Sequence, residues 1–197
     1  NKTQVEEEKN IVKEMEGNLS SLSPSDKQEL LRLKCRTDFL TYARFITSEV
    51  PIAGKFQPFH VHEVIGNFLQ KIGDGDKDYK QSAISLPPRT GKSLLISKVF
   101  PSWQMGRSPT AQFIMSSYAL QLTNENSRAV IEYISHDSFA WLFPECEVDR
   151  DKSNLSAIRN NNGGLIKMAS AGGNVTGFGF GVIDDSELPG VGILDDL

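Results

Sequence analysis

The stretch Ser85–Ser93 constrains the fold of this sequence more than any other, because it joins a short apolar segment to a helical pattern. It reads Ser-Leu-Pro-Pro-Arg-Thr-Gly-Lys-Ser. The preceding residues, Ala83–Leu86, are typical of a short buried strand, and apolar residues recur at helical spacing from Leu94 to Phe100. A glycine between a strand and a helix lets backbone amides curl around an anion, and the helix N-terminus directs free N–H groups at it. The segment Leu86–Ser93 therefore predicts a phosphate-binding loop within an α/β fold.

Two side chains of this loop have distinct expected roles. Lys92 is expected to reach the β- and γ-phosphates of ATP, and the Ser93 hydroxyl is expected to ligate Mg²⁺. One position departs from the general pattern G-x-x-x-x-G-K-[ST], because Leu86 stands where the first glycine is expected. ATP and Mg²⁺ are the expected cofactors. The expected nucleotide contacts in the loop are Pro88, Arg89, Thr90, Gly91, Lys92, Ser93 and Leu94.

A site of this kind also needs an acidic residue at the end of a second apolar strand, where the carboxylate helps to hold Mg²⁺. Two aspartate pairs downstream are candidates. Asp195-Asp196 follows the apolar run Val191–Leu194, whereas Asp184-Asp185 follows a shorter one. We favour the first pair, with Asp195 on the Mg²⁺ side and Asp196 as the base or water-positioning group.

The rest of the chain predicts strands that alternate with helices after a helical N-terminal part. Residues 1–36 are expected to form a helical extension, and residues 37–197 an ATPase domain. Because strands alternate with helices, we expect a mostly parallel sheet covered by helices, as in P-loop NTPases of the ASCE/RecA-like type. The expected helices begin at the cap Ser23–Asp26, at Val61, at Gly91 and at Asn124, and the expected strands are 83–86, 111–116, 164–168 and 191–194.

Composition excludes some classes of partner. The formal net charge is −4, whereas a stand-alone DNA-binding module is more often basic. No apolar run reaches the roughly 18 residues of a membrane-spanning helix, so no membrane partner is expected. Cys35 and Cys146 lie far apart and fit a reducing compartment better than a disulfide framework. The three histidines, His60, His62 and His136, lack the spacing of a metal site and are expected to be structural or exposed.

Several motifs together resemble the ATPase region of phage large terminase subunits. Leu86–Ser93 is similar to the deviant phosphate loop of that family, in which Pro-Pro-Arg-x-Gly-Lys-Ser is typical and the early glycine is also absent. The stretch after the loop resembles the family at Phe100–Trp103, Gly106–Pro109 and Ser116–Tyr118. Gly172–Gly179 resembles its glycine-rich segment before the acidic strand, but Phe178 replaces the usual arginine and the acidic pair comes late.

The resemblance implies an ATPase that works as a homo-oligomeric ring, usually a pentamer, and drives double-stranded DNA into a procapsid. The implied partners are the DNA, the capsid portal protein and the small terminase subunit. The implied location is the cytoplasm of the host cell, with transient docking at the portal. The family also carries a C-terminal DNA nuclease of RNase H-like fold, so the chain is expected to be a truncated part of a longer protein. A helicase-like ATPase and a nucleotide-binding regulator without hydrolysis are the alternatives.

Residues outside the loop are candidates for reading the base. Gln57 resembles the glutamine that reads adenine in related ATPases, because a side-chain amide both donates to and accepts from one base edge. Phe56 or Phe59 is a candidate for stacking on the base.

Three arginines are candidates for stabilising charge during phosphoryl transfer. Arg89 lies inside the loop and is expected to touch the γ-phosphate of its own subunit. Arg128 is expected to act across a subunit boundary as an arginine finger. Arg107 is the rival for that role, although a surface salt bridge is its more ordinary interpretation.

Overall fold

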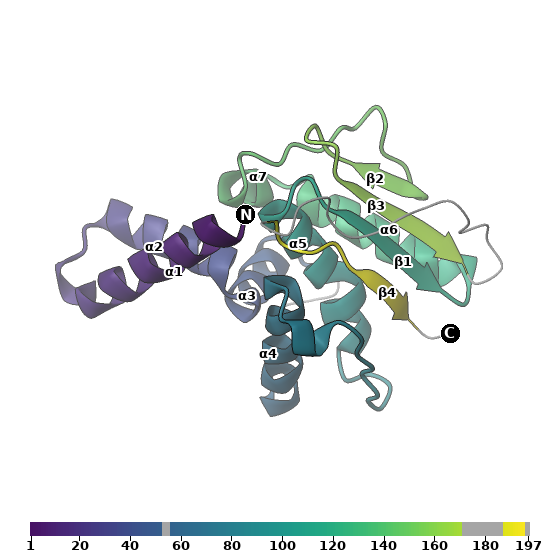
Figure 1. Cartoon of the computed structure of the whole chain (residues 1–197), viewed down its shortest axis with the longest axis horizontal. Helices are drawn as coiled ribbons and strands as arrows, with labels where there is room; N and C mark the ends of the chain where they lie inside the picture. Colours follow the sequence, from purple (N-terminus) through teal and green to yellow (C-terminus); the bar gives the residue numbers. More distant parts are fainter. Residues whose placement is uncertain (53–55, 171–186, 196–197) are drawn as a thin grey trace.

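The computed structural model describes residues 1–52, 56–170 and 187–195. It is a mixed α/β fold in which helices occupy the N-terminal half and a four-stranded sheet the C-terminal half (Figure 1). The elements are α1 (Lys2–Gly17), η1 (Leu19–Ser21), α2 (Pro24–Thr37), α3 (Phe39–Glu49), α4 (His60–Asp74), η2 (Lys77–Tyr79), η3 (Leu94–Val99), α5 (Phe100–Arg107), β1 (Gln112–Ser117), α6 (Leu120–Ile134), α7 (Asp137–Leu142), β2 (Ala157–Arg159), β3 (Leu165–Ser170) and β4 (Gly192–Asp195). No described helix is both long and apolar enough to cross a bilayer.

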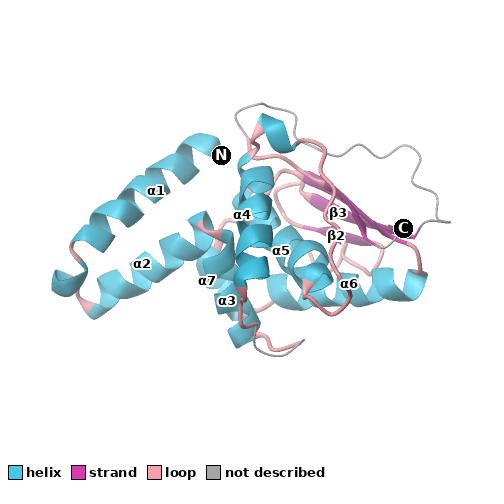
Figure 2. Cartoon of the chain, turned by 90° about the horizontal axis from the view of Figure 1, so that it is seen from below, coloured by secondary structure: helices cyan, strands magenta, loops and turns pink. Residues whose placement is uncertain are grey.

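The sheet has the strand order β2-β3-β1-β4. β1 runs parallel to both β3 and β4, and only β2 is antiparallel to its neighbour β3. The prediction of a mostly parallel sheet is therefore confirmed, and the predicted strands 111–116, 164–168 and 191–194 correspond to β1, β3 and β4. Helix α6 packs along one face of β1 and β3 (Figures 1 and 2). In the register of β1 with β4, Ser117 lies opposite Asp195, so the carboxyl ends of these two strands meet at one edge.

The predicted strand at 83–86 is wrong. This segment pairs with none of the described strands, Ala83 is exposed, and Ile84 and Leu86 are only partly buried. A cavity of about 190 Å³ is lined by Ile84, by residues of α4 and by the whole of β4. An extended segment becomes a strand only when a neighbour lies within hydrogen-bonding distance, and none of the described strands pairs with this one.

Local capping residues explain where several helices begin and end. The Ser23 hydroxyl accepts from the Asp26 amide and the Asp26 carboxylate accepts from the Ser23 amide, with Pro24 in the first turn of α2. The predicted cap at this position is confirmed. Helix α4 ends at Gly75, whose φ of 77° lies in the left-handed region that glycine adopts without strain.

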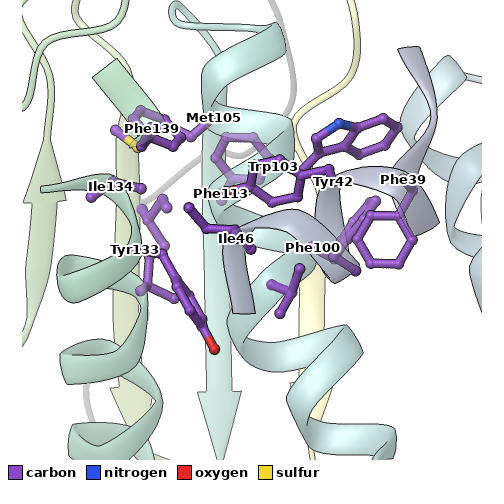
Figure 3. Packing of buried hydrophobic residues seen from close by; sticks show 14 of the residues in the cluster. Phe39, Tyr42, Ile46, Phe100, Trp103, Met105, Phe113, Tyr133, Ile134 and Phe139 are labelled. Atoms are coloured by element: carbon purple, nitrogen blue, oxygen red, sulfur yellow. The ribbon is translucent and has the colours of Figure 1, made fainter. Parts of the chain in front are cut away.

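Aromatic side chains from distant segments form the centre of the core (Figure 3). Every residue of α5 is buried, and the Trp103 ring lies 5.3 Å from that of Phe39 between centroids. The Trp103 indole N–H donates to the Cys35 carbonyl at 2.8 Å, and the hydroxyls of Tyr42 and Ser102 are 2.8 Å apart. The core therefore joins α2 and α3 to the helix that follows the predicted phosphate loop.

The N-terminal extension is a hairpin of α1 and α2 that projects from the body of the molecule (Figures 1 and 2). Buried Arg36 forms ion pairs with Glu8 of α1 at 2.8 Å and with Glu145 at 2.7 Å. Lys9 pairs with Asp74 of α4 at 2.9 Å. The boundary expected at residues 36 and 37 falls in the last turn of α2, so α2 continues from the extension into the body without a linker.

Candidate phosphate-binding site

The predicted phosphate loop encloses an open cavity at the start of a helix. Residues 86–94 line a cavity of about 400 Å³. Helical backbone begins at Lys92, passes through the π-helical segment η3 and continues as α5. The Thr90 hydroxyl donates to the Pro87 carbonyl at 2.8 Å, which closes the loop on itself. A helix N-terminus beside an open cavity is an arrangement that favours anions, because free N–H groups and the helix dipole point at it.

Gly91 occupies a position that no other residue fits well. Its φ is +78°, and a Cβ atom placed on it would lie 3.0 Å from Nε2 of His62. The positive φ strains any L-residue placed here, and a side chain would also make a close contact with the buried His62 ring. Both support the role that the sequence assigns to this glycine.

Arg89 has the unusual backbone of the loop. Its φ is +63°, and among the described residues other than glycine only Arg89 has a positive φ. This left-handed conformation costs a non-glycine residue about 1–2 kcal/mol. Its side chain is exposed and forms no hydrogen bond or ion pair with the described residues. Strain of this kind gathers at functional sites, and the exposed guanidinium is available to an anion at the loop.

The side chains of Ser93 and Asp195 lie together, although 102 positions separate them in the chain. The Ser93 hydroxyl is 3.4 Å from one carboxylate oxygen of Asp195, and the Ser97 hydroxyl donates to the other at 2.6 Å. Asp195 is 5% exposed at the end of β4, against which η3 packs. The carboxyl end of β4, which pairs with β1, therefore lies against the first turns of the helix after the loop.

This geometry fits Mg²⁺ bound together with phosphates. Mg²⁺ takes oxygen ligands and usually keeps several waters, so it uses one or two protein side chains beside the nucleotide. Ser93 and Asp195 present a hydroxyl and a carboxylate to the same place, and Ser97 fixes the orientation of that carboxylate. No described cluster of three or more His, Cys, Asp or Glu side chains is arranged to hold a metal ion.

Only one of the two acidic pairs is partly within the described residues. Asp195 lies beside Ser93, as expected for the favoured pair. Its neighbour Asp196, predicted to position water, and both members of the rival pair, Asp184 and Asp185, lie outside the described residues. Lys92 is partly buried and lines both the loop cavity and the cavity beside β4.

The segment predicted to read the base lies next to the loop. Gln57 and Phe59 precede α4, and both are exposed, Phe59 by 71%. Phe56 is partly buried, and its ring lies 5.0 Å from that of His62. An exposed amide and an exposed aromatic ring thus lie in the segment before His62, and His62 contacts Thr90 of the loop.

The structure separates the arginine candidates. Arg128 is exposed on α6. Arg107 is buried, its guanidinium pairs with Asp74 at 2.5 Å, and it lies over the Trp103 ring at 4.0 Å. Burial lowers the pKa of Arg107, and the adjacent Asp74 opposes that shift. Both interpretations of Arg107 are therefore corrected, because a buried, paired guanidinium is neither a surface salt bridge nor a group that reaches a neighbouring subunit.

The sequence interpretation missed two contacts to the site. His62 is buried and its Nε2 lies 2.6 Å from the Thr90 carbonyl oxygen in the loop. Ser97 holds Asp195. Ser97 follows Ser93 by four positions on a helix, a spacing that places two residues on one face. The pattern of the sequence contained that signal, whereas nothing local connects His62 with Thr90.

No protein-family model, no curated protein and no solved structure matches this chain. The interpretation of the site therefore rests on its residues and their geometry.

Proposed function

We propose that this chain is the ATPase part of a DNA-packaging motor of the large-terminase kind. The observation that carries the proposal is the approach of Ser93, in the first turn after the loop, to Asp195 at the end of β4. A hydroxyl after a phosphate loop and a carboxylate at the end of an adjacent parallel strand are the groups that share Mg²⁺ in P-loop ATPases. The strained Arg89 and the left-handed Gly91 support the same proposal.

In this proposal, Mg·ATP supplies the γ-phosphoryl group and the cation that neutralises its charge. Backbone N–H groups around Gly91 and the Lys92 ammonium hold the phosphates, and Ser93 and Asp195 orient the cation side of the site. Asp196 accepts a proton from, or aligns, the attacking water. Arg89 in cis and Arg128 from a neighbouring copy stabilise the charge that develops on the transferred group.

Substitution of Lys92 tests the enzymatic part. Lys92→Ala is expected to lower the ATPase kcat/KM by at least about 100-fold, because a charge that stabilises the transition state is lost. Lys98→Ala is the matched control, since Lys98 lies on the same helical segment and is likewise partly buried. Equal ATPase rates for the two variants would refute the proposal. Asp196→Asn is expected to reduce kcat while ATP binding persists. If the unmodified protein binds ATP but does not hydrolyse it, the result favours the alternative of a nucleotide-binding regulator.

DNA packaging is tested separately. The assay mixes double-stranded DNA with procapsids that carry portals, the small subunit and the unmodified protein in its longest available form. We expect the DNA to become protected from nuclease in an ATP-dependent way. Arg128→Ala is expected to abolish both protection and DNA-stimulated ATPase, because the arginine acts between copies. Unwinding of duplex DNA without protection would instead support the helicase-like alternative.

A further inference from the structure

His62 bridges two backbone groups from different segments. It lies in the first turn of α4, is 6% exposed, and is flanked by the rings of Phe56 and Phe59 at centroid distances of 5.0 and 5.7 Å. The Phe59 amide donates to Nδ1 at 2.9 Å, and Nε2 lies 2.6 Å from the Thr90 carbonyl oxygen. A buried imidazole that contacts a helix N-terminus and a loop at once requires a definite protonation pattern.

The two contacts fix the tautomer of His62. Nδ1 accepts the Phe59 N–H, so it carries no proton. A neutral imidazole then carries its proton on Nε2, and Nε2–H donates to the Thr90 carbonyl. Both ring nitrogens are occupied by backbone groups, so His62 has no nitrogen left to ligate a metal or to act as a base.

The bond to Thr90 determines the direction of the next amide. The described peptide bonds are all trans, and in a planar trans peptide the C=O and the following N–H point in opposite directions. Because the Thr90 carbonyl points at His62, the Gly91 N–H points in the opposite direction within the same peptide plane, away from the imidazole. The loop cavity is lined by residues 86–94, including Gly91.

We propose that His62 is a positioning residue that holds the Thr90–Gly91 peptide so that the Gly91 N–H is presented to a bound phosphate. It also links that peptide mechanically to the base-reading segment that contains Gln57. This inference rests on the proposed phosphate site, and it assigns to α4 the function of preorganising the loop. Preorganised donors bind an anion more tightly because no reorientation is needed on binding.

The test compares four variants in calorimetric titrations with two probes, Mg·ATP and inorganic triphosphate. His62→Phe keeps the aromatic packing and loses both hydrogen bonds. His62→Gln restores them, because a glutamine at this helix position accepts from the cap amide and its NH₂ group is left to donate to Thr90. Asp38→Ala is the matched control, since it removes a helix-capping hydrogen bond of 2.7 Å on α3, away from the loop.

We expect His62→Phe to raise the Kd of both probes about tenfold, the effect of one lost hydrogen bond in an organised loop. His62→Gln should stay within about threefold of the unmodified protein, and Asp38→Ala should leave both Kd values unchanged. Gln57→Ala should weaken Mg·ATP alone, because triphosphate has no base. If the role of His62 is purely structural, His62→Phe and Asp38→Ala should both lower the melting temperature, and neither should change the Kd values.

Three results overturn the inference: unchanged triphosphate binding in folded His62→Phe, failure of His62→Gln to restore binding, or a His62 ring protonated on Nδ1. The last is measured on the unmodified protein by ¹⁵N spectroscopy of its histidines, so it does not depend on folding of a variant. If the unmodified protein binds neither Mg·ATP nor triphosphate, the proposed function itself is refuted. The experiment therefore distinguishes failure of the proposed function from failure of the inference about His62.

Discussion

Replacing Gly91 by alanine tests the geometry of the loop through stability alone. The methyl group meets two obstacles, a φ of +78° and the buried imidazole of His62 at 3.0 Å. The backbone strain costs about 1–2 kcal/mol. Displacement of the ring breaks its hydrogen bond to Thr90, which adds roughly 1 kcal/mol. The expected loss of unfolding free energy is therefore roughly 2–3 kcal/mol.

Gly163 provides the matched control. Its φ is +88°, but a Cβ atom there meets nothing within 4 Å. Gly163→Ala thus carries only the backbone cost, about 1–2 kcal/mol. The two variants and the unmodified protein are compared by urea unfolding with linear extrapolation, followed by tryptophan fluorescence because Trp103 is fully buried. The difference between the two variants measures the contact with His62.

A double-mutant cycle assigns that difference to the ring. In a His62→Ala background the imidazole is absent, so Gly91→Ala should cost no more than Gly163→Ala, and the coupling free energy should be about 1 kcal/mol. Equal costs of the two glycine substitutions in the unmodified background would refute the contact. An excess cost that persists after His62→Ala would show that the loop resists alanine for another reason.

Three further predictions concern other contacts of the described residues. Ser97→Ala removes the 2.6 Å bond to the β4 carboxylate and should weaken Mg²⁺-dependent ATP binding about 10- to 100-fold, whereas Mg²⁺-free binding stays unchanged; equal losses in both would contradict this. Burial raises the pKa of Asp74, but the Arg107 charge and hydrogen bonds from Gln70 and Lys9 outweigh it and hold the pKa below 3.8. The ionised Asp74 therefore contributes its full share to the free energy of unfolding above the pKa of the unfolded state, and this share is lost as the pH falls below about 3.8. In Asp74→Asn the free energy of unfolding should depend less on pH in this acid range. Burial raises the pKa of Cys35 to about 12, so this thiol should react with a disulfide reagent only after unfolding; rapid reaction in the native state would contradict that burial.

Local signals in the sequence predicted much of the framework. The cap at Ser23–Asp26 and the helix that begins after Gly91 both follow from interactions within a few residues. The alternation of strands and helices likewise predicted a mostly parallel sheet, because parallel strands need a crossover between them. The short elements α7 and β2 were not predicted, since segments of this length carry too little periodicity to be recognised.

The local sequence was enough to predict the loop with its glycine, lysine and serine, and the helix that begins there. The groups that surround the loop come from distant parts of the chain and depend on how the elements pack. Asp195 approaches Ser93 because β4 pairs with β1, and His62 approaches Thr90 because α4 packs beside the loop. The segment 83–86 has the composition of a strand but pairs with none of the described strands. Each of these outcomes depends on residues far apart in the chain, and local propensity carries no information about which distant groups meet.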